Sequence, residues 1–214
     1  ATLTLIGEDR STFGGAFVVD EFALLFKVFF LSVALIVLMV SFRYFREGRF
    51  YQGEFYFLLL TSFLGCLLMP SSRDLLMLFI SLELVSAPGF LLAAFRKSDP
   101  RSNEAGIKFF LFGVLSTAVM LYGMSLLYGF AGTSTLTTPP GATFASLEGA
   151  AGAAAGQPAF LVAIVLVFAG LAGTVVNTSV TVAIAAIADD FDASISSVAV
   201  TVLLLNVAMA FLMP

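Results

Sequence analysis

The sequence has no histidine, no tryptophan and a single cysteine, Cys66. One cysteine cannot form a disulfide within the chain. Without histidine or a second cysteine, the chain also lacks a plausible ligand set for structural zinc, for histidine-ligated haem or for an iron–sulfur cluster. We therefore expect no metal and no cofactor, and any redox chemistry would have to take place in a partner protein.

Charged side chains are scarce as well. They make up 11% of the 214 residues, whereas hydrophobic residues make up 60%. A soluble domain of this length needs more charge to cover its surface, so the lipid bilayer is the expected solvent. The few charges give a net charge of −4 and no basic face. Nucleic acid is therefore not an expected partner.

Long apolar runs dominate what remains. A helix needs about 20 apolar residues to cross a bilayer, and six runs approach or exceed that length. They lie at 22–42, 55–69, 75–95, 105–130, 160–188 and 198–213. Because the runs are continuous rather than alternating, strands are not expected in them. The fold class that follows is an all-α integral membrane protein with about six transmembrane helices.

The chain divides into three parts on this basis. Residues 1–136 hold the first four runs, and residues 158–214 hold the last two. The segment between them, 137–157, is rich in glycine, alanine, threonine and proline, which predicts a flexible external loop.

Basic residues in the connections predict how the helices are oriented. Six lie in the first and third connections, namely Arg43, Arg46, Arg49, Arg96, Lys97 and Arg101. The second connection has only Arg73, and the fourth has no lysine or arginine. The first and third connections should therefore face the cytoplasm. The fifth connection, 189–197, is acidic with no lysine or arginine, so its side of the membrane stays open.

One carboxyl lies in the middle of an apolar run. Glu83 is the ninth residue of the run at 75–95, where an acidic side chain costs about 2.5–3.5 kcal/mol. Such a group should face protein or water, and loss of hydration favours its protonated form. Pro88 cannot donate a hydrogen bond to the carbonyl of Leu84, so a kink is expected nearby. Ser81 and Ser86 could hydrogen-bond there. Glu83 could handle protons or ions, or it could simply be a protonated group that joins two helices.

Two further polar features lie within the runs. Lys108 follows Glu104 by four residues, which favours an ion pair at the membrane surface. Thr174, Asn177, Thr178 and Thr181 share one face of the fifth helix. That face could line a hydrophilic cavity or contact a neighbouring helix.

Several stretches resemble a known family. They are FVVDEFALLFK, GEFYFLLLTSFLGCLLM, LLMLFISLELVSAPGFLLAAFRK and EAGIKFFLFG. In order and spacing, they resemble membrane subunit N of the bacterial proton-pumping NADH–quinone oxidoreductase (respiratory complex I), which is related to cation/proton antiporter subunits. The resemblance extends over about residues 17–172.

This resemblance implies a function and two site residues. The essential intramembrane glutamate of the family falls on Glu83, and the lysine of its A-x-K-[YF]-F helix falls on Lys108. In such subunits, the glutamate and the lysine change their coupling as protons move through a half-channel. The implied protein is a multi-pass subunit of the bacterial inner membrane that binds no flavin or cluster. Its implied partners are the lipid bilayer and the other membrane subunits of complex I.

The sequence departs from this family after PAFLVAIVLVFAGLA. The family has a lysine at the next position, but Gly173 and Thr174 stand here, and no proline breaks the run that ends at residue 188. The tail at 173–214 begins with GTVVNTSVTVAIAAIADDFDAS, and through this stretch it instead resembles the first helices of major facilitator superfamily drug exporters. Two alternatives to a proton-channel subunit therefore stay open. The chain could be a fragment of a drug/proton antiporter of that superfamily, or a membrane scaffold without activity.

Overall fold

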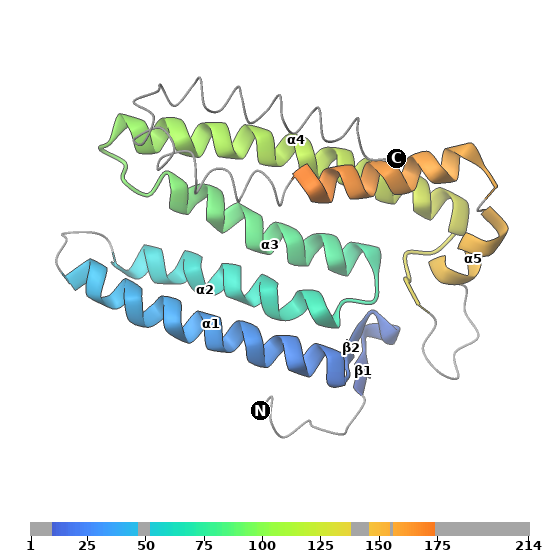
Figure 1. The fold of residues 1–214 in the computed structure, drawn as a ribbon, viewed down its shortest axis with the longest axis horizontal. Helices are drawn as coiled ribbons and strands as arrows, with labels where there is room; N and C mark the ends of the chain where they lie inside the picture. Colours follow the sequence, from blue (N-terminus) through green and yellow to red (C-terminus); the bar gives the residue numbers. More distant parts are fainter. Residues whose placement is uncertain (1–9, 47–51, 138–145, 155, 174–214) are drawn as a thin grey trace.

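Four of the predicted runs form the long helices of the computed structural model, which describes residues 10–46, 52–137, 146–154 and 156–173. These helices are α1 (Glu21–Arg46), α2 (Gln52–Leu68), α3 (Leu75–Ala93) and α4 (Pro100–Ala131) (Figure 1). Each is long and apolar enough to cross a bilayer, which confirms the prediction of an all-α integral membrane protein. The fifth run begins as the helix Pro158–Gly173. The rest of that run and the run at 198–213 lie outside the described residues.

The polar residues at the ends of the helices fix their boundaries. α4 begins five residues earlier than the apolar run predicted, because Asp99 caps it by accepting a hydrogen bond from Arg101 N at 3.0 Å. Pro100 occupies the first turn, where a missing N–H costs nothing. The helix ends at Gly132, whose φ of 67° lies in the left-handed region that favours glycine.

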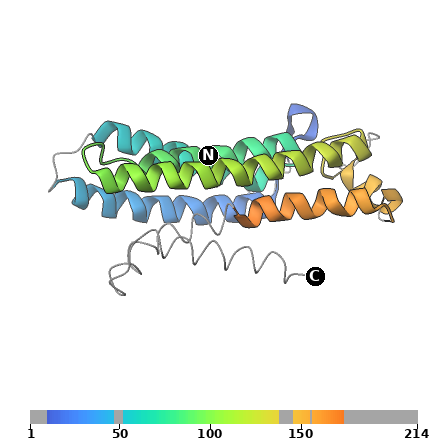
Figure 2. The same ribbon diagram turned by 90° about the horizontal axis from the view of Figure 1, so that it is seen from above.

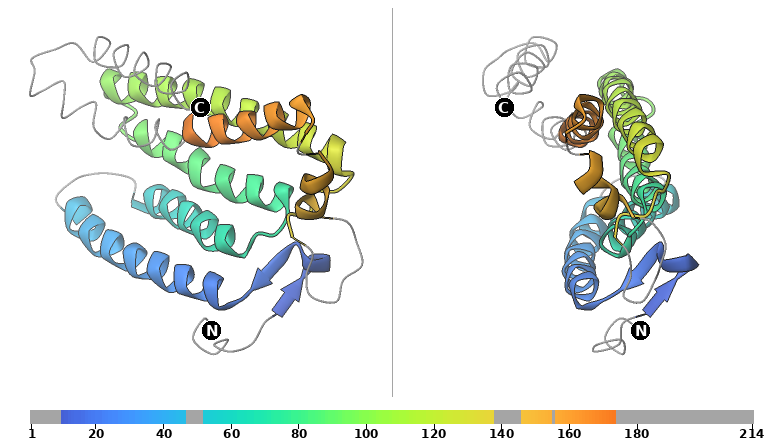
Figure 3. Two further views of the ribbon diagram at one scale, coloured as in Figure 1. Left: turned by 45° about the vertical axis from the view of Figure 1, so that its right-hand side comes forward. Right: turned by 90° about the vertical axis from the view of Figure 1, so that its right-hand side faces the viewer.

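The four long helices form one row in the order α1, α2, α3, α4, and each runs antiparallel to the next (Figure 1). The helix Pro158–Gly173 packs against α4 and lies out of this row (Figures 2 and 3). A buried cluster joins the two elements and the start of α3. Its members are Leu75, Met120, Met124, Leu127, Phe160 and Ala163. Many large apolar side chains elsewhere on α1 and α4 are exposed, as expected for a surface solvated by lipid.

A short β-hairpin precedes α1. β1 (Arg10–Thr12) pairs antiparallel with β2 (Phe17–Val19), and η2 (Phe13–Gly15) joins them. These strands lie outside the apolar runs, so they do not conflict with the prediction that the runs themselves are helical.

The turn between α2 and α3 is paired on both sides. It follows η3 (Met69–Ser71), and its residue Ser72 forms a β-bridge with Phe17 of the hairpin. On the other side, Asp74 forms a β-bridge with Thr135, which follows α4. The turn therefore ties the N-terminal hairpin to the segment after α4.

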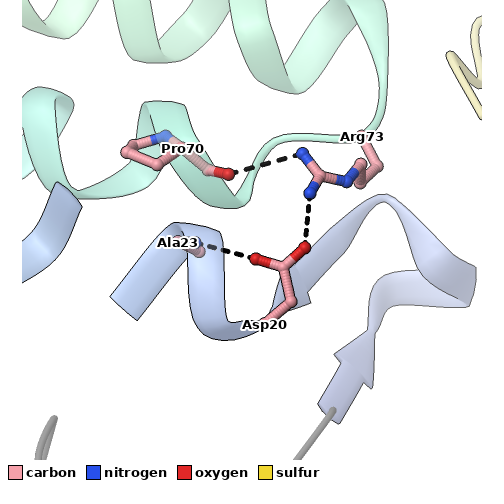
Figure 4. Close-up of polar contacts among 4 residues, drawn as sticks. All are labelled: Asp20, Ala23, Pro70 and Arg73. Carbon is pink, nitrogen blue, oxygen red and sulfur yellow. Dashed lines mark hydrogen bonds and ion pairs between the residues drawn. The ribbon is translucent and has the colours of Figure 1, made fainter. Parts of the chain in front are cut away.

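An ion pair strengthens this tie (Figure 4). Arg73 Nη2 lies 2.6 Å from Asp20 Oδ2, and Arg73 Nη1 donates to the carbonyl of Pro70 at 3.4 Å. The other carboxylate oxygen of Asp20 accepts a hydrogen bond from Ala23 N at 2.8 Å, which caps α1. One carboxylate thus serves both the start of α1 and the turn.

The opposite end of the row brings the first and third connections together. Lys97 Nζ lies 3.2 Å from Glu54 Oε2, and the ring centroids of Phe55 and Phe95 are 5.6 Å apart. The two basic connections therefore share one end of the helices, as the charge distribution predicted. That this end faces the cytoplasm stays a prediction.

The segment at 137–157, predicted as a flexible external loop, contains a helix that the prediction did not include. Helix α5 (Leu147–Ala154) is rich in alanine, the residue with the highest helix propensity. Ser146 Oγ accepts a hydrogen bond from Gly149 N at 3.2 Å near its start. Residues 138–145 of the same segment lie outside the described residues.

Candidate functional site

Glu83 lies between α3 and α4. Its Oε1 atom is buried and has no hydrogen-bond partner within the described residues. Thr117 of α4 lies within hydrogen-bonding reach of the carboxyl group and is itself buried. No lysine or arginine among the described residues forms an ion pair with Glu83. The site is therefore a carboxyl in an apolar helix, with the hydroxyl of Thr117 beside it.

The hydroxyl of Thr117 suits a group that changes its protonation state. Thr117 Oγ1 donates to the carbonyl of Val114 at 3.1 Å, which leaves its lone pairs free. It can accept a hydrogen bond from a protonated Glu83, or turn and donate one to the carboxylate. Both forms of the acid can thus be accommodated without moving a helix.

The serines near Glu83 have other partners. Ser81 Oγ donates to the carbonyl of Met77 at 2.7 Å, and Ser86 Oγ donates to that of Leu82 at 3.0 Å. Ser81 also lies 3.3 Å from Ser72 Oγ, on the side of α3 that faces α2. Both hydroxyls therefore form hydrogen bonds near Glu83, as expected, and they form them with backbone carbonyls of α3.

Pro88 is accommodated inside α3, which continues through it to Ala93. Its missing N–H leaves the carbonyl of Leu84 without its usual partner. Ser62 of α2 donates to the neighbouring carbonyl, that of Val85, at 3.2 Å. A hydroxyl from the adjacent helix thus supplies a polar contact where the backbone ladder is weakened. The kink itself stays a prediction.

Lys108 does not meet Glu83. It forms the predicted ion pair with Glu104, and 38% of its side chain is exposed. Thr117, which contacts Glu83, is nine residues further along α4, about 13 Å along the helix axis and roughly half a turn around it. The structure therefore separates the two predicted site residues, and their roles stay predictions.

An aromatic cluster lies on the α4-facing side of α3, two helical turns from Glu83. The Phe90 ring is buried and meets Phe109 edge-on, with ring centroids 4.8 Å apart. Phe110 lies on another side of the ring, at 5.8 Å. The tip of the ring rests on Gly113, where a Cβ atom would overlap it. Sequence reasoning missed this cluster, because three phenylalanines among 24 carry no signal of their own.

Sequence reasoning also missed Thr117 and the Arg73–Asp20 ion pair. Thr117 had a usable signal, since it is a polar residue within an apolar run. Arg73 and Asp20 had none, because they are 53 residues apart in the chain. The polar residues predicted to share a face at 174–181 lie outside the described residues. In the described part of the chain, no three Cys, Asp or Glu side chains gather in a way that could hold a metal ion.

Comparison with known proteins agrees with this arrangement of helices. Residues 72–175 match the transmembrane family described as NADH:quinone oxidoreductase/Mrp antiporter. A chain of respiratory complex I from Thermus thermophilus, in a structure with bound aureothin, superposes with a TM-score of 0.60 and 27% identity. The match covers 83% of this chain and 40% of that one.

Individual relatives are more similar in sequence. NAD(P)H-quinone oxidoreductase subunit 2 of Gloeobacter violaceus is 39% identical over 175 residues, which is 80% of this chain and 32% of the relative. NADH-quinone oxidoreductase subunit N 2 of Rhizobium meliloti is 37% identical over 174 residues, or 80% and 34%. The chain thus spans about a third of the length of the curated relatives it matches. Through residues 72–175, this multi-pass membrane protein is similar to the transmembrane family of NADH:quinone oxidoreductase and Mrp antiporter proteins.

Proposed function

We propose that this chain is part of a membrane subunit of a proton-translocating NADH–quinone oxidoreductase in the bacterial plasma membrane. It works there with the other membrane subunits of the complex, and Glu83 carries a proton across part of the membrane. The names of the relatives support the assignment to this complex. The residues that match the family, 72–175, include Glu83.

One observation carries the proton-transfer role. Glu83 Oε1 is buried, and no hydrogen-bond partner for it lies within the part of the chain that the structure describes. A buried polar atom without a hydrogen bond costs about 1–3 kcal/mol of stability. Such atoms are rare in folded proteins, and a functional role is one explanation for them. An acid that must release and recover a proton cannot be held in one protonation state by a fixed ion pair. Within the described residues, Glu83 has no such ion pair.

Lys108 has a second role in this proposal. It exchanges protons near the end of α4 where Lys97 and Glu54 meet, and it is held by Glu104 in the structure described here. Because Lys108 is about 13 Å from the level of Thr117, a proton could pass between Lys108 and Glu83 only through water or after a rearrangement.

The test is the substitution Glu83→Gln in the intact membrane complex that contains this chain. The amide keeps the shape of the side chain but cannot carry a proton. We expect NADH-driven proton pumping into closed vesicles to be lost, while the amount of assembled complex is unchanged. The matched control is Glu54→Gln, which makes the same chemical change at an exposed site whose partner is Lys97. Pumping by Glu83→Gln at the parent rate would exclude Glu83 from the mechanism.

The likeness of residues 173–214 to drug exporters stays a prediction. The family match ends at residue 175, so it covers only the first three residues of that part of the chain, and the comparisons give the likeness to drug exporters no support. A drug-binding face at 174–181 would protect Asn177→Cys from thiol reagents when a transported drug is present. A labelling rate that no drug changes counts against a transporter. Failure of the chain to co-purify with complex I subunits in mild detergent would instead favour the scaffold alternative.

A further inference from the structure

From Glu83, the interface of α3 and α4 extends toward both ends of the helices. Toward the end that carries Arg73, the interface is filled by the buried cluster around Leu75 and Met120. Toward the end that carries Lys97, the next buried side chain on the same face of α3 is Phe90. Water that reaches Glu83 along this interface from the Lys97 end must pass Phe90.

Phe90 fills its place tightly. Its ring lies over Gly113, and the rings of Phe109 and Phe110 close two of its sides. About two turns nearer the start of α4, a Cβ atom added to Gly106 would lie only 3.1 Å from Ala94 Cα. The two helices therefore approach each other closely at Gly106 and Gly113.

The ring is nevertheless placed where it could move. Gly113 has no side chain to place beneath the tip of the ring, which therefore rests on backbone there. Pro88, two residues before Phe90, removes one hydrogen bond from α3 between this ring and Glu83. At the Arg73 end, the cluster around Met120 combines side chains of three helices and so packs the interface from a further side.

We propose that Phe90, seated on Gly113, is an apolar plug that separates Glu83 from the aqueous phase at the Lys97 end of the helices. Hydrophobic constrictions of this kind block ions and protons because water does not fill them. When the ring leaves Gly113, water enters and Glu83 exchanges its proton with that end. The use of the plug in proton transfer rests on the proposed function, but its effect on access does not.

Access can be measured without any activity. Cys66 is the only cysteine, so Cys66→Ala gives a background in which Glu83→Cys is the single thiol. A charged thiol reagent reacts only with a thiol that water can reach. We apply it to sealed vesicles of each orientation that contain the assembled protein. With Phe90 present, labelling from the Lys97 end should be slow.

Replacing the ring should open that end. We expect Phe90→Ala to speed labelling of Glu83→Cys about tenfold or more from the Lys97 end, and to leave labelling from the Arg73 end unchanged. Phe90→Leu, which retains most of the packing, should give a smaller increase with the same sidedness. The matched control is Leu91→Ala, because Leu91 is the next residue of α3 and is 58% exposed. It should leave both rates unchanged.

Three results would overturn the plug. One is fast labelling of Glu83→Cys from the Lys97 end while Phe90 is still present, which needs no Phe90 variant to fold. The others are an unchanged rate in both Phe90 variants, and an equal increase from both ends, which would indicate general loosening. These outcomes leave the proton-pumping test of Glu83→Gln untouched, and failure of that test leaves the labelling result standing.

Discussion

The side chains of Arg73 and Asp20 form an ion pair that joins the α2–α3 turn to the start of α1, with 2.6 Å between Nη2 and Oδ2. Both side chains are only about a quarter exposed, at 25% and 28%. The second oxygen of Asp20 caps α1 by accepting a hydrogen bond from Ala23 N. The carboxylate therefore links the start of α1 to the turn between α2 and α3. The pair is therefore expected to contribute more to stability than a surface ion pair does.

Replacing Asp20 by asparagine separates its two roles. The amide can still cap α1, because asparagine is as good an N-cap as aspartate, but the charge-assisted bond to Arg73 is lost. We expect Asp20→Asn to lower the free energy of unfolding by about 1–2 kcal/mol. Thermal unfolding of the protein in mild detergent would show this as a lower Tm.

The pair at the other end of the helices provides the control. Lys97 and Glu54 lie 3.2 Å apart, but their side chains are 72% and 56% exposed. Glu54→Gln should therefore cost less than about 0.5 kcal/mol. Equal losses of stability in Asp20→Asn and Glu54→Gln would show that the partly buried ion pair contributes no more to stability than the exposed one.

A second prediction concerns two glycines of α4 that differ only in their surroundings. A Cβ atom on Gly123 would lie 2.8 Å from Val167 N and 2.9 Å from Ala163 O, both on the neighbouring helix. A Cβ atom on Gly129 would meet nothing within 4 Å. The close approach at Gly123 is backbone to backbone, so it cannot be relieved by turning a side chain.

Gly123→Ala should push the helix Pro158–Gly173 away from α4 and lower the free energy of unfolding by about 1–3 kcal/mol. Gly129→Ala should leave stability unchanged or raise it slightly, because alanine is the better helix former. Thermal unfolding of both variants, with protein accumulation in the membrane as a second readout, checks the difference. Similar behaviour of the two variants would mean that the helices do not pack as closely as described.

The sequence was sufficient to predict the helices because lipid imposes a simple rule. Every backbone polar group in the bilayer needs an internal partner, so a long apolar run has to be helical. The runs at 22–42 and 75–95 match α1 and α3 to within a few residues. The boundaries of α4 were less predictable, because its first turn is polar and depends on the cap at Asp99.

The candidate site was predictable only in part, for a different physical reason. Glu83 stands out because a carboxyl in an apolar run is costly wherever the run packs. Phe90 and Gly113 are ordinary residues in such a run, and their importance arises only from contact between two helices. The pairing of Arg73 with Asp20 likewise depends on the order of the helices in the row.

Lys108 offers a test that separates a structural role from a role in proton transfer. Its ion pair with Glu104 is exposed, so it contributes little to stability, and Lys108→Met should leave the Tm nearly unchanged. Lys108→Arg keeps the positive charge and can keep the pair with Glu104, but a guanidinium group stays protonated in proteins. If Lys108 exchanges protons, both variants should lose NADH-driven proton pumping although only one of them loses the charge.

The matched controls are Lys97→Met and Lys97→Arg, which change a lysine in the α3–α4 connection in the same ways. They should pump at the parent rate. If Lys108→Arg pumps normally while Lys108→Met does not, the site needs only a fixed positive charge, and Lys108 acts on its surroundings rather than as a proton carrier. Normal pumping by both Lys108 variants would leave the ion pair with Glu104 as the whole role of this residue.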